Sequence, residues 1–217
     1  MTKKKKVKKP AIDGLYAITA DEPDTAMLLR RAKLALQGGI RVLQYRNKSA
    51  AEALKVEQAH ALRRLTREFN ATFMVNDDAR LAALADADGV HIGAADGSVS
   101  GTRGLLGDAK IIGVSCYNRA PLAFEAMRQG ADYVAFGAFF SSGVKPGAVK
   151  AELSLLRSVR SEINLPIVAI GGITPHNGAP LLEAGADALA VISALWNAPD
   201  IEQAAKDFSI LFNKVSA

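Results

Sequence analysis

The sequence predicts an α/β protein of the (β/α)8 barrel (TIM barrel) class, in which eight parallel strands alternate with helices in a single domain. Three observations support this prediction. Eight short apolar runs recur along the 217 residues, stretches with helical spacing of apolar residues separate them, and the runs are apolar almost throughout. Strands that are covered on both faces show such continuous runs, and eight β/α units in about 200 residues are near the lower size limit of this barrel.

The expected strands and helices follow one another in regular order. The strands are predicted at residues 15–18, 42–43, 73–75, 90–92, 111–114, 133–136, 167–170 and 189–192. Apolar residues at helical spacing lie between the runs, as at Leu54, Leu62, Leu65 and Phe69, and again over residues 201–212. These stretches predict the helices that connect the strands.

Glycines mark the expected turns from helix to strand. They occur at Gly38-Gly39, Gly130-Ala131-Asp132 and Gly185-Ala186-Asp187, where glycine permits the left-handed conformation that ends a helix. The recurring Gly-Ala-Asp indicates a weak internal repeat of the β/α unit. An open, doubly wound sheet is the alternative architecture, but no glycine fingerprint for a dinucleotide follows the first run.

The basic residues are concentrated at the N-terminus. The formal charge is +5, yet six of the 27 lysines and arginines lie within the first ten positions. Without these six, the rest of the chain has 21 basic and 22 acidic side chains, which gives a net charge of −1. We therefore expect residues 1–11 to form a solvated, disordered tail and residues 12–217 to form the catalytic barrel. No aromatic residue is interleaved with the lysines, which argues against nucleic-acid binding.

Composition also limits the compartment and the chemistry. The sequence has no secretory h-region and no run of 18 apolar residues, so we expect a soluble, cytoplasmic protein without a membrane partner. The single cysteine, Cys116, excludes an intramolecular disulfide, and a half-buried structural thiol is favoured over a nucleophile. The three histidines, His60, His91 and His176, are too scattered for a metal cluster. For His91, a packed core position is favoured over one that faces the barrel mouth.

Polar residues follow the apolar runs, at the points where all strands of a barrel open onto one face. Gln44, Arg46 and Lys48 follow the second run at a spacing of two, which places them on one side of an extended segment. A convergent arginine and lysine suit phosphoryl oxygens, because the guanidinium binds as a fork and the ammonium as a point charge. A solvated strand end accounts for the local sequence equally well.

Carboxylates follow the next two runs. Asn76, Asp77 and Asp78 come after the third run, and Asp96 comes after the fourth. Two carboxylates on neighbouring loops suit a magnesium ion whose other positions are filled by phosphate and water. Alternatively, Asn76 or Asp77 caps the following helix and Asp96 is an ordinary turn residue.

Two further regions suit anions. Residues 137–145 combine small hydroxyl residues and glycine with a closing Lys145, as in a mobile anion-binding loop, although a plain surface loop is the alternative. Gly171-Gly172 follows the seventh run, and Ile192-Ser193 lies at the end of the eighth, where many barrels bind phosphate. The sequence thus predicts a metal-bound diphosphate site and a separate monophosphate site.

These motifs together, in kind and order, resemble the thiamine phosphate synthase family. The matching segments are 44–48, Asn76-Asp77, 91–93 with Asp96, 113–115, Lys145, 171–173 and 191–193, and the resemblance covers residues 14–198. It implies a Mg²⁺-dependent transferase that joins hydroxymethylpyrimidine diphosphate to hydroxyethylthiazole phosphate, giving thiamine phosphate and pyrophosphate. This reaction needs no protein nucleophile, which agrees with the lack of a Ser/His/Asp arrangement in the sequence.

The resemblance also implies a role for each matching residue. Gln44 contacts the pyrimidine, Asp77 and Asp96 bind Mg²⁺, and Ser115 approaches the leaving group. The residues implied to hold the diphosphate are Arg46, Lys48, Asn76 and Lys145, and those implied to hold the thiazole phosphate are Ser142, Gly172, Ile192 and Ser193. The expected catalytic residues are Arg46, Lys48, Ser115 and Lys145.

Three positions depart from the family pattern. Ala94 stands where glutamine is usual, Val144 lies in a loop that usually contains threonine, and Tyr117 replaces a common histidine. A thiazole tautomerase-like isomerase and a non-catalytic binder of thiazole or thiamine phosphate are therefore alternative functions. Retention of the diphosphate residues argues against the isomerase. Small-molecule substrates are the expected partners, and the oligomeric state is left open.

Overall fold

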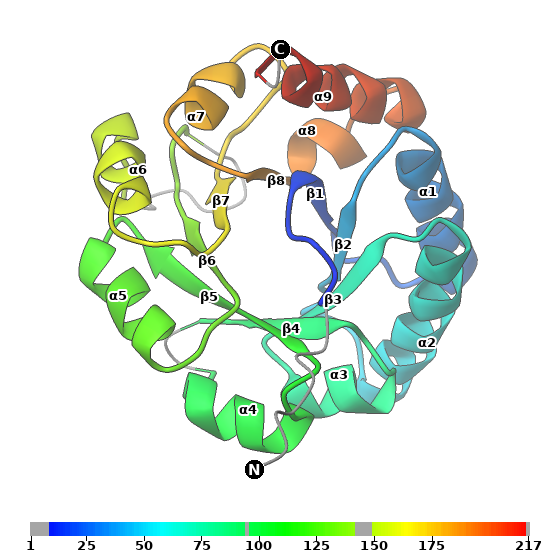
Figure 1. Ribbon diagram of the computed structural model, residues 1–217. Helices are drawn as coiled ribbons and strands as arrows, with labels where there is room; N and C mark the ends of the chain where they lie inside the picture. Colours follow the sequence, from blue (N-terminus) through cyan, green and yellow to red (C-terminus); the bar gives the residue numbers. More distant parts are fainter. Residues whose placement is uncertain (1–8, 94–95, 142–148, 216–217) are drawn as a thin grey trace.

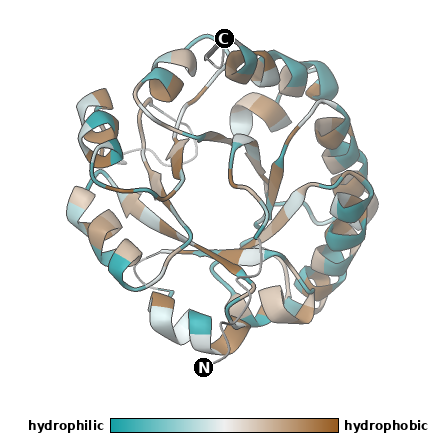
Figure 2. Ribbon diagram, viewed as in Figure 1, coloured by the Kyte–Doolittle hydropathy of each residue, from teal (hydrophilic) through white to brown (hydrophobic). Residues whose placement is uncertain are grey.

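The computed structural model describes residues 9–93, 96–141 and 149–215, and it confirms the predicted (β/α)8 barrel. The strands pair in parallel in sequence order, and the last strand closes the barrel by pairing with the first. Figure 1 shows the strands as an inner ring and the helices as an outer ring. In Figure 2 hydrophobic residues concentrate along the strands, whereas hydrophilic residues are found mainly on the helices.

Each predicted apolar run coincides with a strand, and several strands extend beyond the run. The strands are β1 (Gly14–Ile18), β2 (Val42–Tyr45), β3 (Thr72–Asn76), β4 (Gly89–Ile92), β5 (Ile111–Tyr117), β6 (Tyr133–Phe136), β7 (Ile167–Ile170) and β8 (Ala188–Val191). β2 therefore contains Gln44, which the sequence placed just after the strand, and β3 contains Asn76.

Helices connect the strands, as the helical spacing predicted. They are α1 (Thr25–Gln37), α2 (Glu52–Glu68), α3 (Ala79–Leu84), α4 (Val99–Leu106), α5 (Ala120–Arg128), α6 (Leu153–Arg160), α7 (Ala179–Glu183), α8 (Ser193–Trp196) and α9 (Ile201–Val215). Aspartates cap three of them: Asp24 accepts from the first turn of α1, Asp78 from the backbone N–H of Leu81 in α3, and Asp200 from that of Gln203 in α9.

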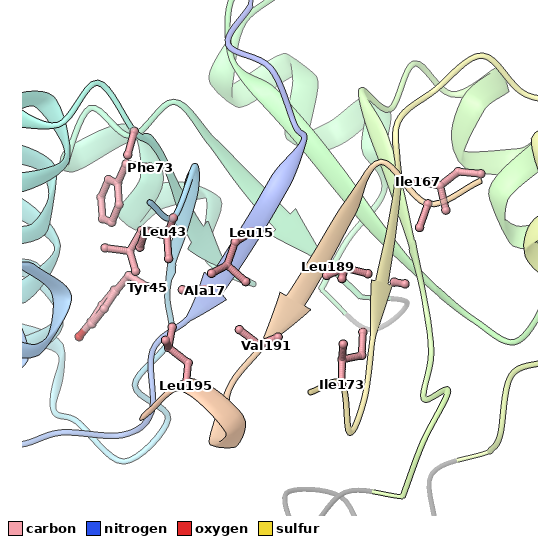
Figure 3. Close-up of a cluster of buried hydrophobic side chains, with 14 of the residues drawn as sticks. Leu15, Ala17, Leu43, Tyr45, Phe73, Ile167, Ile173, Leu189, Val191 and Leu195 are labelled. Atoms are coloured by element: carbon pink, nitrogen blue, oxygen red, sulfur yellow. The ribbon is translucent and has the colours of Figure 1, made fainter. Parts of the chain in front are cut away.

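Two hydrophobic layers stabilise the barrel, because successive strand residues point to opposite faces. Leu15 and Ala17 of β1 face the helices and pack beside Leu189 and Val191 of β8 in the larger layer (Figure 3). The alternate residues point into the barrel and form a smaller interior cluster that includes Tyr16, Ile18, Val42, Met74, Tyr133 and Val168. Inward positions at the ends of the strands are therefore the ones that face the mouth.

A repeated ion pair closes the end of the barrel where the strands begin. Asp88, just before β4, accepts hydrogen bonds from both terminal nitrogens of Arg63, which lies on α2, and from the backbone N–H of Phe73 in β3. The same arrangement recurs for Asp132 with Arg103 and Ile112, and for Asp187 with Arg160 and Ile167. The Gly-Ala-Asp repeat in the sequence thus marks two of these three pairs, each joining an odd strand to the following even strand.

The N-terminal segment reaches this same end of the barrel. The Lys9 ammonium lies 2.6 Å from Asp132, and Ile12 belongs to the interior hydrophobic cluster. Of the predicted basic tail, only residues 9–11 are among the described residues. Within the described residues, no helix is long and apolar enough to cross a membrane.

Candidate active site

The barrel interior becomes polar towards the end where the strands finish. Gln44, Asn76, His91 and Ser115 occupy inward positions on β2, β3, β4 and β5, and Asn76 is paired in register with His91. All four residues therefore lie on the inner side of the barrel towards one mouth. The sequence predicted this for Gln44 and Asn76, whereas it favoured a packed core position for His91. Gln44 is buried, and the other three are half-buried.

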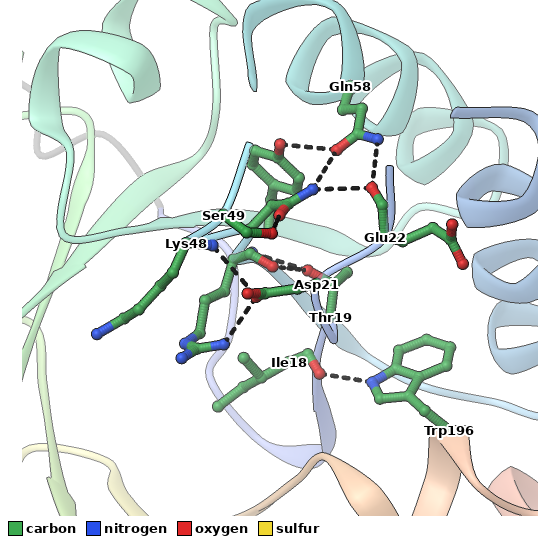
Figure 4. Close-up of polar contacts among 11 residues, drawn as sticks. Ile18, Thr19, Asp21, Glu22, Lys48, Ser49, Gln58 and Trp196 are labelled. Carbon is green, nitrogen blue, oxygen red and sulfur yellow. Dashed lines mark hydrogen bonds and ion pairs between the residues drawn. The ribbon is translucent and has the colours of Figure 1, made fainter. Parts of the chain in front are cut away.

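Arg46 and Lys48 are fixed by the loop that follows β1. Thr19 and Arg46 exchange two hydrogen bonds: the Arg46 N–H donates to the Thr19 hydroxyl at 2.8 Å, and that hydroxyl donates to the Arg46 carbonyl at 2.7 Å. Asp21 accepts from the Arg46 guanidinium at 3.1 Å and from the Lys48 N–H at 3.1 Å. Figure 4 shows Asp21 beside Lys48. Asp21 thus orients the Arg46 guanidinium and holds the backbone of Lys48, a role that the sequence reasoning missed although Asp21 follows the first apolar run.

Asp77 has an uncommon backbone conformation directly after β3. Its φ is 63°, and its N–H donates to the carbonyl of His91 at 2.7 Å. The helix cap that the sequence offered as an alternative for Asn76 or Asp77 is instead made by Asp78. The Asp77 carboxylate is therefore not needed for capping, and strained backbone of this kind clusters at functional sites.

The carboxylates of Asp77 and Asp96 lie close enough to affect each other. Burial, followed by the charge of Asp96 and a hydrogen bond with it, raises the pKa of Asp77, whereas Lys48 and Asn76 lower it. Asp96 is held in place by the N–H of Gly93, which donates to its carboxylate at 2.8 Å. Two like charges at one place create a site that favours a cation.

These residues fit a magnesium ion better than a transition metal. The described residues contain no group of three or more histidine, cysteine, aspartate and glutamate side chains that could hold a metal ion. Mg²⁺ commonly takes only one or two carboxylates and keeps water and substrate phosphate as its other ligands. The pair formed by Asp77 and Asp96 matches that requirement.

A chain of hydrogen bonds crosses the barrel below the mouth, with its two inner links buried and its two links at His91 partly buried. It runs from Gln44 to Tyr16, Tyr133, His91 and finally Ser115, and each of its four links measures 2.8 Å. Burial lowers the pKa of His91 to about 4, although the charge of Asp96 opposes this, so its imidazole is neutral at pH 7. His91 thus faces the interior with both nitrogens bonded, and the sequence reasoning did not identify Tyr16 or Tyr133.

The ends of β7 and β8 form a separate part of the mouth. Gly171 and Gly172 both have positive φ, and a Cβ on Gly172 would lie 2.4 Å from the carbonyl oxygen of Ser141. Only glycine therefore allows the chain after β6 to approach so closely. Ser193 begins α8 immediately after Ile192, and the first N–H groups of a helix lack partners within the helix.

Some predicted residues lie outside the described part of the chain. They are Ser142 and Lys145 of the expected anion loop, together with Ala94 and Val144, two of the three departures from the family pattern. The third departure, Tyr117, is described: it ends β5, is exposed, and has a φ of 54°. Cys116 is more deeply buried than predicted, and burial raises the pKa of its thiol to about 12.

Comparison with known proteins gives a consistent result. The profile of the family described as "Thiamine monophosphate synthase" matches residues 15–195. Two proteins named thiamine-phosphate synthase are similar over almost their whole length: one from Methylobacillus flagellatus is 53% identical, covering 94% of this chain and 97% of the relative, and one from Thiobacillus denitrificans is 51% identical, covering 92% and 94%.

A solved structure agrees with the sequence relatives. The thiamine phosphate pyrophosphorylase from Pyrococcus furiosus superposes with a TM-score of 0.85 at 34% identity, covering 94% of this chain and 97% of that chain. The residues that the family profile matches, 15–195, include all eight strands except Gly14 and the described residues of the polar mouth. The chain therefore belongs to the thiamine monophosphate synthase family.

Proposed function

We propose that this chain is a thiamine phosphate synthase, a transferase that joins hydroxymethylpyrimidine diphosphate to hydroxyethylthiazole phosphate and releases pyrophosphate. The observation that carries the proposal is the adjacent pair Asp77 and Asp96, with Lys48 close enough to lower the pKa of Asp77. Carboxylates that favour a cation, next to a lysine, suit a metal-bound diphosphate. The sequence relatives support the synthase over the isomerase and the non-catalytic binder.

The diphosphate is assigned to one side of the mouth. Arg46, Lys48, Asn76 and Lys145 are the residues proposed to bind it, and Gln44 is proposed to contact the pyrimidine. Asp21 occupies only one of the five N–H donors of the Arg46 guanidinium at 3.1 Å, so other donors remain for phosphate oxygens. A guanidinium that is already oriented loses less conformational entropy when it binds the substrate.

Asp77 and Asp96 are proposed to hold Mg²⁺ at this site. When bound there, the ion supplies positive charge that stabilises the departing pyrophosphate. Its binding also offsets the repulsion that raises the pKa of Asp77.

The proposed reaction is a dissociative substitution in which the protein stabilises charge and supplies no nucleophile. The carbon–oxygen bond to the diphosphate breaks first, and the thiazole nitrogen then attacks the pyrimidine-methyl cation. Arg46, Lys48, Ser115 and Lys145 are proposed to stabilise the charge that develops on the leaving group. Cys116 is not a nucleophile, because its thiol is buried and burial raises its pKa to about 12.

The thiazole phosphate is assigned to the other side of the mouth. Ser142, Gly172, Ile192 and Ser193 are the residues proposed to surround it. The left-handed Gly172 and the beginning of α8 at Ser193 support this assignment, since exposed backbone N–H groups suit a phosphate. The single cysteine further supports a cytoplasmic location, which is also part of the proposal.

Product formation tests the proposal directly. Purified protein is mixed with both substrates and Mg²⁺, and thiamine phosphate and pyrophosphate are measured. We expect both products in equal amounts, and turnover at least about tenfold lower for Asp77→Asn, Asp96→Asn and Lys145→Ala. Asp78→Asn is the matched control, because asparagine caps a helix as well as aspartate does, and its turnover should equal that of the wild type. No product under conditions in which a relative is active overturns the proposal.

A further inference from the structure

We propose that Tyr16, Tyr133 and His91 are positioning residues that make the Ser115 hydroxyl a hydrogen-bond donor towards the leaving diphosphate. The inference rests on the proposed function, and it adds a specific task for two buried tyrosines and the half-buried His91. None of the three was among the candidate site residues that the sequence identified. The chain of five residues from Gln44 to Ser115 is called the relay below.

The relay connects five different strands through side chains only. Its links are the Gln44 amide to the Tyr16 hydroxyl, Tyr16 to the Tyr133 hydroxyl, Tyr133 to Nδ1 of His91, and Nε2 of His91 to the Ser115 hydroxyl, each at 2.8 Å. These residues belong to β2, β1, β6, β4 and β5. The relay therefore crosses the barrel and ends at the mouth.

The donors in the relay can be assigned by counting hydrogens. The amide nitrogen of Gln44 donates to the Tyr16 oxygen, so the single hydroxyl hydrogen of Tyr16 is available for Tyr133. Tyr133 then uses its own hydrogen on Nδ1 of His91. Because Nδ1 accepts this hydrogen, it carries no proton of its own, so the N–H of the imidazole ring is at Nε2 and donates to Ser115.

This direction leaves the hydroxyl hydrogen of Ser115 unused within the relay. The Ser115 oxygen accepts from His91, so its O–H is available to a group at the mouth. In the opposite direction Ser115 donates to His91 and presents only lone pairs, which repel an anionic oxygen. The opposite direction also leaves the Tyr16 hydrogen without an acceptor in the relay, because the Gln44 nitrogen cannot accept it.

Packing holds the relay in one arrangement. Tyr133 is 0% exposed and Tyr16 is 1% exposed, so water does not compete for the inner links. A Cβ on Gly113 would lie 2.0 Å from the Tyr133 ring, so the absence of a side chain there makes room for the phenol. The Tyr133 ring also stacks on the His91 ring, with centroids 5.5 Å apart. Buried networks in which every partner is satisfied are rigid.

The relay matters at the moment when the diphosphate leaves. Negative charge then develops on its oxygens, and a donor that is already oriented stabilises that charge without reorganisation. Loss of the relay should therefore lower kcat and leave the KM for the thiazole phosphate unchanged, because the monophosphate is assigned to the other side of the mouth.

Nitrogen-15 NMR of the imidazole rings tests the direction without any activity measurement. The wild type at pH 7 should show His91 protonated at Nε2 and not at Nδ1. His60→Gln and His176→Gln, which change the two histidines outside the relay, identify the His91 signals. In Tyr133→Phe the preference for Nε2 should weaken or reverse. A wild-type His91 protonated at Nδ1, or a charged His91, overturns the proposal.

A double-mutant cycle tests the consequence for turnover. Ser115→Ala removes a donor to the developing charge and should lower kcat roughly 100-fold. Tyr133→Phe only misdirects that donor, so it should lower kcat less, by about tenfold. In the Ser115→Ala background, Tyr133→Phe should have no further effect, because it acts only through Ser115. Independent, multiplicative losses in the double variant overturn the proposal.

Tyr45→Phe is the matched control for the loss of a buried phenol oxygen. The Tyr45 hydroxyl donates to Gln58 at 2.8 Å on the outer side of β2, so it makes a buried hydrogen bond but does not belong to the relay. The kcat of Tyr45→Phe should match that of the wild type, even where Tyr45→Phe lowers the unfolding temperature as much as Tyr133→Phe does. If the protein makes no thiamine phosphate but His91 is protonated at Nε2, the proposed function fails and the relay stands. If it makes thiamine phosphate but His91 is protonated at Nδ1, the relay fails alone.

Discussion

Replacing Asp88 by asparagine tests the ion pairs that close the base of the barrel. Both carboxylate oxygens already accept hydrogen bonds: one from Arg63 at 2.9 Å, and the other from Arg63 at 2.8 Å and from the Phe73 N–H at 2.8 Å. Whichever oxygen becomes an amide NH2 in Asp88→Asn, that group faces an existing donor. The Arg63 and Asp88 side chains are only 12% and 17% exposed, so water compensates little.

The expected cost follows from these contacts. At least one charge-assisted hydrogen bond is lost, and such bonds contribute about 1.5–3 kcal/mol. We therefore expect the free energy of unfolding to fall by about 2 kcal/mol. For a chain of this length, that change lowers the unfolding temperature by about 4–8 °C. Turnover of the folded protein should be unchanged, because Asp88 lies at the opposite end of the barrel from the mouth.

Asp86→Asn is the matched control for the same chemical change. Asp86 also contacts two cations, Arg67 and Lys110, each at 2.6 Å, but its side chain is 61% exposed. Exposed pairs contribute little, so a change below about 0.5 kcal/mol is expected, and asparagine tolerates the positive φ at this position. Both variants are compared with the wild type by urea and thermal unfolding monitored by circular dichroism. Equal effects of the two substitutions, or a change below about 0.5 kcal/mol for Asp88→Asn, refute the reasoning.

Three further predictions concern the mouth, the interior and the N-terminus. Without Mg²⁺, Asp77→Asn should raise the unfolding temperature at pH 7, because burial and Asp96 raise the pKa of Asp77 and the wild type therefore loses stability as the pH rises through the raised pKa. The gain should vanish at pH values where the Asp77 carboxyl is protonated in both the folded and the unfolded state, and a variant less stable than the wild type at pH 7 contradicts this prediction. Gly113→Ala should lower the free energy of unfolding in urea by about 2 kcal/mol, because the added Cβ meets the Tyr133 ring. Gly104→Ala, in open space on α4, should raise it by about 0.5–1 kcal/mol, and the reverse order of the two effects disproves the packing argument. Deleting residues 2–8 should leave turnover unchanged in the product assay, and a collapse of turnover shows that these residues contribute to the site.

The barrel could be predicted because each strand carries its own signal. Residues 133–136 and 167–170 form uninterrupted apolar runs, and the structure places β6 and β7 at those residues. A parallel strand buried on both faces needs apolar residues on both sides, so its composition alone identifies it. The proximity of Asp77 and Asp96 was predictable for a similar reason, since neighbouring parallel strands end at the same face.

Local hydrogen bonding was less predictable. Asn76, Asp77 and Asp78 are all residue types that cap helices, and the sequence offered only the first two for that role. The structure assigns the cap to Asp78, because Asp77 has a φ of 63° and Asp78 has the extended conformation that a capping residue requires. Backbone angles decide between adjacent residues of equal propensity, and composition does not contain them.

The sequence by itself determined the strand order, the position of the mouth and the types of charged residue around it, because these depend on contiguous patterns of polarity. Only the tertiary structure showed that Tyr16 and Tyr133, 117 positions apart, share a hydrogen bond inside the barrel. Only the structure, likewise, showed Asp21 holding Arg46, and Asp88 joining β3 to α2. The Tyr16–Tyr133 contact joins β1 to β6 across the interior and depends on the closure of the barrel, whereas the other two depend on how neighbouring strands and helices pack. No local sequence pattern encodes these distances.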